Sequence, residues 1–275
     1  MGVNDLLLEV RVDGHTVPPA ELAEVERVRA VHVLTQMRSL GADIGLGDTA
    51  PDFLDHAAAT TAVVRAKLRL GHDGIVNLYR DQLAESDGFW RDVAARSPLH
   101  TDFKPAITEI DAYGLTIPEF LGGVSALLNT RKMGRFYGTH PEHFAIRMPG
   151  TKADAMETVG HYGNPVFLRL AMHSAKHAPL PRDPDTTVAM FATAALAADD
   201  TPMKLVVLHQ LKQRPFGTTL KLGIFFPSAT PDEMVEGHKW HLAIEFCGFV
   251  RVAAAAHAPG RTAMARLALP ALTRL

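Results

Sequence analysis

The chain of 275 residues carries 28 Lys and Arg against 30 Asp and Glu, a formal net charge of −2 with neutral histidines. This balance excludes the basic surface that a nucleic-acid partner needs, and it gives no attraction to an acidic membrane. Apolar residues make up 47% of the chain, enough for a packed core, but no apolar run reaches the ~20 residues of a bilayer span. With no signal-peptide pattern and only one cysteine, Cys247, we expect a cytoplasmic protein without disulfides. The unusual number is 14 histidines.

Helical periodicity dominates residues 1–135. Pro19 suits the first turn of a helix, and Gly41 suits the left-handed position that follows a last turn. Thr49 is a candidate cap for the second helix, and Gly71 is its expected stop. The four predicted helices cover residues 19–40, 51–70, 75–95 and 118–133.

Residues 136–275 change to short alternating stretches that indicate strands. Arg214-Pro-Phe-Gly217 separates two of them and predicts a hairpin turn. The sequence thus predicts an α+β fold in one continuous domain, with N-terminal helices packed on an antiparallel, curved sheet or partial β-barrel. The predicted strands cover residues 143–148, 157–170, 187–197, 203–213, 218–226 and 241–256.

Nine of the 14 histidines follow residue 135, and metal sites favour neutral imidazoles with a carboxylate. On the expected last strand, His241 and Glu245 share one face, whereas His238 points to the other. His173 and His177 are four apart, which on a helix places both on one side. We therefore take His241, His173 and His177 as candidate metal ligands, with solvated or edge histidines as the alternative. His140 and His143 lie in a predicted loop without fixed geometry.

His161 is the leading acid–base candidate, because it lies in a Gly-rich turn where the backbone can approach a ligand. Tyr162 and Asn164 beside it can form hydrogen bonds, and Glu245 is a candidate partner in proton transfer. The alternative is a strand bend whose polar groups satisfy one another. Two arginines could clamp a substrate carboxylate unless they face solvent: Arg147 and Arg169.

Several catalytic signatures are absent from the sequence. It contains no Gly-x-Ser-x-Gly elbow, no P-loop and no dinucleotide-binding Gly motif between a strand and a helix, so no nucleotide cofactor is expected. Cys247, inside an apolar stretch, is expected to be a small buried residue and not a nucleophile.

One stretch resembles the core of haem catalases and the smaller catalase-related peroxidases. It comprises Phe144-Ala-Ile-Arg-Met148 and the segment from Val159-Gly-His-Tyr-Gly163 through Asn-Pro-Val-Phe-Leu-Arg169, about 26 residues, with fainter similarity at 213–217 and 221–227. The resemblance implies an antiparallel barrel with helices, and haem as cofactor. The chain departs from the family pattern in three ways. It lacks the distal-His segment, no Tyr follows Tyr162 to serve as haem ligand, and His161 stands where the family has an active-site Asn.

Three functions remain open from the sequence. The first is a small-molecule oxidoreductase of bacterial specialised metabolism that uses haem or His-bound iron. The second is a cofactor-free cyclase, lyase or dehydratase with His acid–base catalysis. The third is a non-catalytic ligand-binding protein. A small molecule is the expected partner, and a homodimer is the expected oligomer on general grounds.

Overall fold

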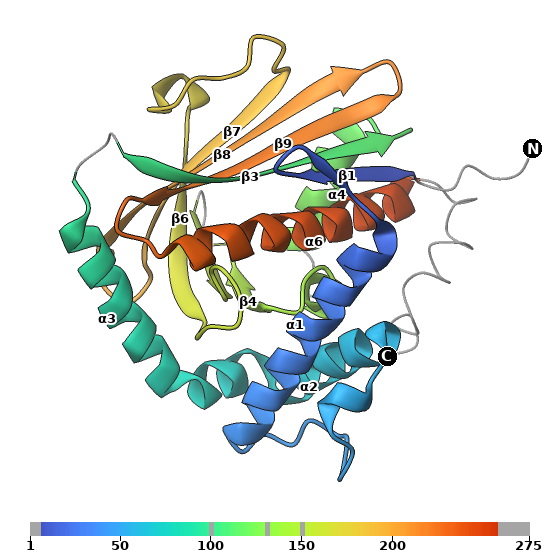
Figure 1. The fold of residues 1–275 in the computed structure, drawn as a ribbon, viewed down its shortest axis with the longest axis vertical. Coiled ribbons are helices and arrows are strands. Elements are labelled where there is room, and N and C mark those ends of the chain that lie inside the picture. Colours follow the sequence, from blue (N-terminus) through green and yellow to red (C-terminus); the bar gives the residue numbers. More distant parts are fainter. Residues whose placement is uncertain (1–6, 99–101, 130–132, 149–151, 258–275) are drawn as a thin grey trace, which may run out of the picture.

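A nine-stranded antiparallel sheet organises the fold (Figure 1). The computed structural model describes residues 7–98, 102–129, 133–148 and 152–257. Within them the sheet curves without closing, and its strand order is β2-β1-β3-β9-β8-β7-β6-β5-β4. The strands are β1 (Leu8–Val12), β2 (His15–Val17), β3 (Phe103–Tyr113), β4 (His143–Arg147), β5 (Lys152–Glu157), β6 (Val166–His173), β7 (Val188–Leu196), β8 (Pro202–Arg214) and β9 (Gly217–Pro227).

The helices lie in both halves of the chain and confirm the predicted α+β class. Most of them come from the N-terminal half, and the longest, α6, ends the described part of the chain. The helices are α1 (Pro19–Ser39), α2 (His56–Leu78), α3 (Arg80–Arg96), α4 (Ile117–Leu128), α5 (Met133–Tyr137) and α6 (Asp232–His257), with short 3-10 turns η1 (Pro51–Phe53) and η2 (Ala175–His177).

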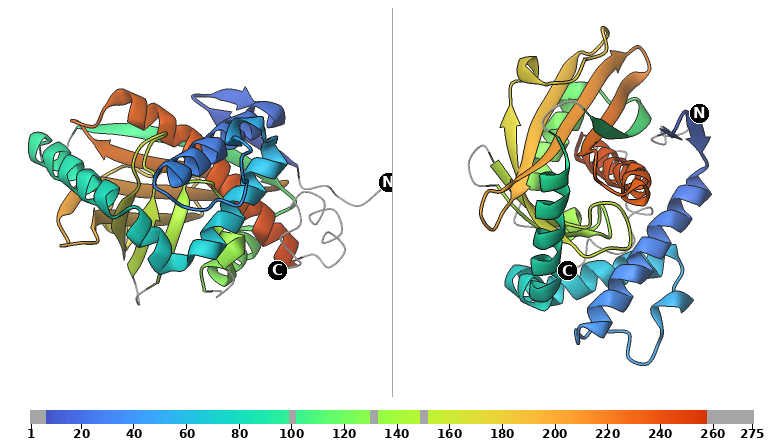
Figure 2. Two further views of the ribbon diagram at one scale, coloured as in Figure 1. Left: turned by 90° about the horizontal axis from the view of Figure 1, so that it is seen from below. Right: turned by 60° about the vertical axis from the view of Figure 1, so that its left-hand side comes forward.

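The helix α6 lies against the sheet and forms the centre of the molecule. It contacts β3 and β1 on one side and α4 and α1 on others. Figure 2 shows it almost end-on between the sheet and α1. Its burial extends around most of its circumference, as expected for a helix enclosed by other elements. Most side chains of α6 therefore lie in the interior, whereas Glu233, Glu236 and Arg251 remain exposed.

The prediction of a strand over residues 241–256 is wrong, because α6 covers this segment. The alternation of Phe246, Gly248, Val250 and Val252 resembled a strand. A helix that is apolar on all sides produces no clear 3.6-residue period, so periodicity alone cannot separate the two. The length of the apolar stretch, and the run of alanines at 253–256, were the better signal for a helix.

The other differences concern the N-terminal half. Three strands there, β1, β2 and β3, were not predicted, and β3 pairs along its whole length with β9. Gly71 does not end α2. It bends the helix through a positive φ of 65°, and the chain then continues to Leu78. Asp55 caps α2 in place of Thr49, because its carboxylate accepts the Ala58 N–H. The predicted fourth helix, 118–133, matches α4, while α5 begins at its last residue and was not predicted; residues 130–132 lie outside the described residues.

The remaining strand predictions agree closely with the structure. β8 and β9 form the predicted hairpin, with Arg214 opposite Gly217. The segment 157–170 is two strands, the end of β5 and most of β6, with the loop around His161 between them. None of the helices in the described residues has the length and apolar character needed to cross a membrane.

Candidate metal centre

Four histidines meet beneath the sheet, from two segments almost 100 residues apart. His140 lies in the turn before β4 and His143 begins that strand, while His238 and His241 come from α6. All four are buried, with at most 4% exposure. The ring centroid of His241 is 3.8 Å from that of His140, 5.3 Å from that of His143 and 4.8 Å from that of His238.

Three of these residues could hold a metal ion. One ligand nitrogen each from His140, His143 and His241 lies within 4.8 Å of the others. Burial lowers the pKa of each of these rings well below the usual value, so the imidazoles are neutral. A neutral imidazole with a free lone pair is the form that binds a metal ion.

Helical geometry explains how α6 contributes to this centre. His238, His241 and Glu245 are spaced by three and four residues, which aligns them along one face of the helix. The prediction that His238 points away from His241 is therefore wrong, because it assumed a strand. His238 itself is held by the Gly160 N–H, which donates to its Nδ1 over 3.3 Å.

Two carboxyl groups border the histidines. His143 Nε2 lies 3.5 Å from Glu245 Oε1 and 3.9 Å from Glu157 Oε2. Burial raises the pKa of Glu157 to about 7, and burial together with the neighbouring Glu157 raises the pKa of Glu245 well above its usual value. Bonds of ~2.1 Å to one ion place its ligand atoms about 3.0–3.4 Å apart. The separation of His143 from Glu245 is close to this spacing.

A buried ion pair contacts both the turn and the helix that carry the histidines. Arg29 of α1 pairs with Glu142, and its guanidinium also donates to the Gly160 and Gly237 carbonyls over 3.0 and 2.7 Å. Glu142 Oε2 lies 3.6 Å from His241 Nδ1. A carboxylate behind a ligating histidine typically fixes the ring orientation. Glu142 is therefore in position to orient His241.

A buried lysine fixes the turn that carries His140 and His143. Lys67 of α2 has no exposed surface, and its Nζ donates to the carbonyls of Pro141 and His143. Burial lowers the pKa of this lysine well below the usual value. Helices α1 and α2 thus each insert one basic side chain to hold the segment 141–143.

The unpartnered polar atoms gather at this centre. Among the described residues, buried side-chain atoms without a hydrogen-bond partner include His140 Nε2, His143 Nε2 and both ring nitrogens of His241. Leaving such atoms unpaired costs about 1–3 kcal/mol each, so a buried cluster of them calls for a partner. The free nitrogens of His143 and His241 fit a metal ion, because lone pairs that no protein group occupies are what an ion needs.

A porphyrin fits this centre less well than a bare ion. The His140 and His241 rings stack directly, and the His143 ring stacks on Phe136 at 5.1 Å. Such close packing leaves no flat apolar slot between these rings. A single metal ion held by histidines is the better match to the residues present.

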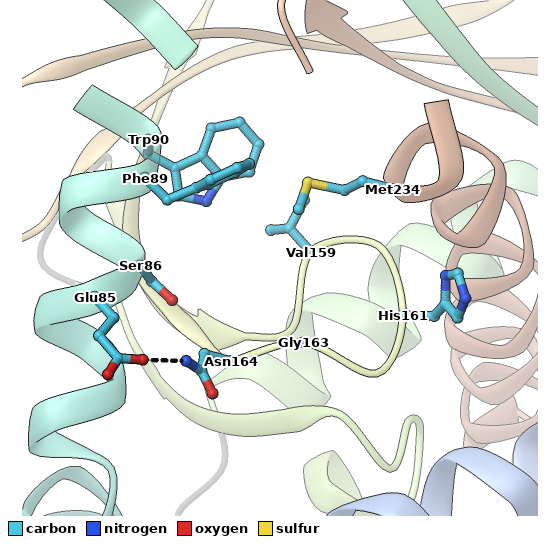
Figure 3. A pocket seen from close by; sticks show the side chains of 9 residues that line it. All are labelled: Glu85, Ser86, Phe89, Trp90, Val159, His161, Gly163, Asn164 and Met234. Atoms are coloured by element: carbon cyan, nitrogen blue, oxygen red, sulfur yellow. Dashed lines mark hydrogen bonds between the residues drawn. The ribbon is translucent and has the colours of Figure 1, made fainter. Parts of the chain in front are cut away.

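A separate small cavity lies beside α3 (Figure 3). Its volume is about 250 Å³, and Phe89, Trp90, Val159 and Met234 give it an apolar wall. Such a volume lies just below the usual range for ligand pockets, about 300–1,000 Å³. Asn164 lies at its other end, where its side-chain amide donates to Glu85 over 2.8 Å.

His161 and Asn164 both line this cavity, as their shared turn suggested, but the His161 ring is not turned toward the Asn164 amide. Figure 3 shows its ring beside α6, on the far side of the loop from Asn164. There it packs so closely on Gly237 that a Cβ at that position would lie 2.0 Å from His161 Nδ1. Tyr162 is 44% exposed, and its ring lies 4.5 Å from that of His161. The described contacts do not join His161 to Glu245, which faces His143 instead.

The two candidate clamp arginines are engaged elsewhere. Arg169 forms a two-point ion pair with Asp154 and a third contact to Asp200, which raise its pKa. Arg147 is exposed and donates to the His72 ring over 3.1 Å. Neither contacts the buried histidines in the described structure, so the expectation that they clamp a substrate there is not supported by their positions.

His173 and His177 do not form a helical pair. His173 ends β6 and contacts the Thr193 hydroxyl over 2.8 Å, while His177 ends the short turn η2. Both are exposed. The prediction of a shared helical face is wrong, because Pro179 and Pro181 follow directly and no helix forms. Of the three predicted metal ligands, the structure brings only His241 into the centre.

Sequence reasoning did not place His140 and His143 in the candidate centre, and it missed Arg29, Lys67 and Glu142 as the residues that hold their turn. The repeated His-x-x-His spacing at 140–143 and 238–241 was the available signal. The cations carried no signal, since a buried lysine or arginine reads in sequence like a surface one. No protein-family model and no curated protein sequence matches this chain significantly.

Proposed function

We propose that this protein is a small-molecule oxidoreductase whose buried centre binds one iron ion through His143, His241 and Glu245. The observation that carries the proposal is the place of His143, which offers a ring nitrogen within 4.8 Å of one from His241 and whose Nε2 lies 3.5 Å from Glu245 Oε1. Two histidines and one carboxylate with open positions are the ligand set of non-haem iron oxygenases.

Charge supports the same assignment. Without an ion, burial disfavours ionisation of both carboxyl groups: it raises the pKa of Glu157 to about 7 and, together with the charge of Glu157, raises the pKa of Glu245 well above its usual value. A divalent cation reverses this preference, because it stabilises two adjacent carboxylates. Such a centre would supply redox chemistry, while this chain's own residues exclude water and orient the ligands. The resemblance of residues 144–169 to a family of redox metalloproteins is consistent with an iron centre. The context we propose for the reaction is bacterial specialised metabolism.

The proposal is tested by metal analysis and absorption spectroscopy of protein purified after growth with added iron. We expect about one iron per chain and no Soret band. The variants His143→Ala, His241→Ala and Glu245→Ala should lose the ion, whereas His173→Ala, at an exposed site, should retain it. A Soret band would instead indicate haem, and a wild-type protein that binds no metal would contradict the proposal.

Acid–base catalysis without a metal is the second candidate. The observation that favours it is the carboxyl of Glu157, whose pKa of about 7 suits proton transfer at neutral pH, beside the neutral His143 ring. Activity that survives exhaustive chelation but is lost in Glu157→Gln would select this function over the first.

A further inference from the structure

His140 differs from the other two histidines of the centre in its hydrogen bonding. The backbone N–H of Glu142 donates to His140 Nδ1 over 2.9 Å. A backbone amide has only a proton to give, so Nδ1 holds a lone pair and no proton. A neutral His140 ring must then carry its proton on Nε2. This Nε2–H is buried and has no acceptor among the described residues.

His143 and His241 can instead carry their proton on Nδ1 and present a lone pair on Nε2. His143 Nδ1 faces the Thr139 hydroxyl at 3.4 Å, and that hydroxyl already donates to the Phe136 carbonyl. The Thr139 oxygen can therefore act only as an acceptor, which favours a proton on His143 Nδ1 and a lone pair on its Nε2. His241 Nδ1 faces the Glu142 carboxylate at 3.6 Å, which likewise leaves Nε2 free to bind.

Ring packing gives a second, independent reason to separate His140 from the ligands. An imidazole binds an ion in the plane of its ring. His140 and His241 are stacked with centroids 3.8 Å apart and planes only 27° from parallel. Two rings stacked in this way cannot both direct an in-plane lone pair at one ion within bonding distance.

We infer that His140 is not a metal ligand but a hydrogen-bond donor to a small anionic ligand on the ion held by His143, His241 and Glu245. The inference rests on the proposed iron centre and adds the position and chemistry of its external ligand. Two buried basic side chains agree with an anion here, because Arg29 pairs with Glu142 and Lys67 donates to the carbonyls of Pro141 and His143, in the turn that follows His140.

The first test reads the tautomer of the wild-type protein directly. In metal-free, ¹⁵N-labelled protein, NMR correlations of the His140 ring should show a protonated Nε2 and an unprotonated Nδ1. The signal is assigned by its loss in His140→Gln. A proton on Nδ1 would overturn the inference whatever the metal content.

The second test uses iron-loaded protein with azide as the anionic probe. We expect His140→Ala to keep its iron but to bind azide roughly 10–100-fold more weakly, the loss expected for one hydrogen bond to a charged group. His140→Gln, whose amide can donate, should recover part of that affinity. His143→Ala is the comparison that should lose iron itself.

The outcomes separate this inference from the proposed function. Iron in the wild type but not in either His140 variant would make His140 a ligand and overturn the inference alone. Unchanged azide affinity in a folded His140→Ala protein would do the same. A wild-type chain that binds no iron would overturn the proposed function and the anion site together, while the tautomer remains decided by NMR.

Discussion

Arg29 and Glu142 form an ion pair from which solvent is excluded, with 2% and 0% of their side chains exposed. The two residues are 113 positions apart. Their pairing joins α1 to the turn that carries His140 and His143. Because Arg29 also donates to carbonyls of the 160 loop and of α6, one side chain connects three segments around the candidate metal centre.

Removing one partner of this pair should be costly. Arg29→Met leaves the Glu142 carboxylate buried without its partner, which typically lowers the free energy of unfolding by about 3–5 kcal/mol. Urea unfolding followed by circular dichroism measures the loss. Arg27→Met is the matched control, because its partner Glu24 is exposed and little change is expected. Equal effects for the two variants would contradict the structural role given to Arg29.

Acid should destabilise the metal-free protein from about pH 6.5 downward. Burial lowers the pKa of seven histidines: that of His209 to about 4, those of the four centre histidines well below their usual value, and those of His32 and His161 as well. In the unfolded chain they take up protons near pH 6.5, so the stability present above that pH is lost as pH falls toward the folded values. Three carboxyl groups whose pKa burial raises, Asp87, Glu157 and Glu245, act in the opposite sense, but seven histidines outnumber them.

The measurement is the urea midpoint at pH 7.5 and pH 5.5 in the presence of a chelator. His238→Gln should reduce the pH dependence of the unfolding free energy by up to about 1.4 kcal/mol per pH unit, the effect of one proton. His173→Ala, at an exposed position, should leave it unchanged. A midpoint that rises on acidification would mean that the carboxyl groups dominate.

Helix α6 packs so closely on the turn before His140 that any side chain at Gly248 should destabilise the protein. A Cβ there would lie 2.5 Å from the Thr139 carbonyl oxygen, so Gly248→Ala must push the turn and the helix apart. We expect a loss of about 1–3 kcal/mol in unfolding free energy and weaker metal binding. Gly88→Ala is the control, since Gly88 is exposed within α3 and nothing lies within 4 Å of its added Cβ. That change should stabilise the protein by about 0.5–1 kcal/mol.

The two carboxyl groups should contribute unequally to iron binding. Glu245 is nearer to His143 Nε2 and shares a helical face with His241, so Glu245→Gln should weaken iron binding at least about tenfold. Glu157→Gln should have a smaller effect, because Glu157 Oε2 is 3.9 Å from His143. Competition with a chelator measures both affinities, and Glu85→Gln, in the separate cavity, serves as control. A larger loss of iron affinity in Glu157→Gln than in Glu245→Gln would make Glu157, and not Glu245, the carboxylate ligand.

Much of the secondary structure in the C-terminal half could be predicted from the sequence, because it depends on residues that are close along the chain. The hairpin of β8 and β9 follows from a turn sequence between two apolar runs, and β4, β7 and α1 begin and end close to their predicted bounds. β3 was missed although it is a central strand. Helix α6 was mistaken for a strand, because burial on all sides removes the period that distinguishes the two.

The candidate centre was found only in part for the same reason. His241 and Glu245 were singled out by residue type, and their separation of four residues has opposite meanings on a strand and on a helix. His161 was given the main role because its Gly-rich turn is a visible local pattern. The structure turns that ring toward Gly237 and gives the central place to His143.

The sequence by itself determined the class of fold, the surplus of histidines in the second half and the residue types that suit a metal. These depend on composition and on neighbours along the chain. Only the tertiary structure decided that His140 and His143 meet His241, and that Arg29, Lys67 and Glu142 enclose them. Such contacts join segments about 75 to 210 residues apart, and they form because burying α6 under the sheet brings those segments together. No local pattern encodes that approach.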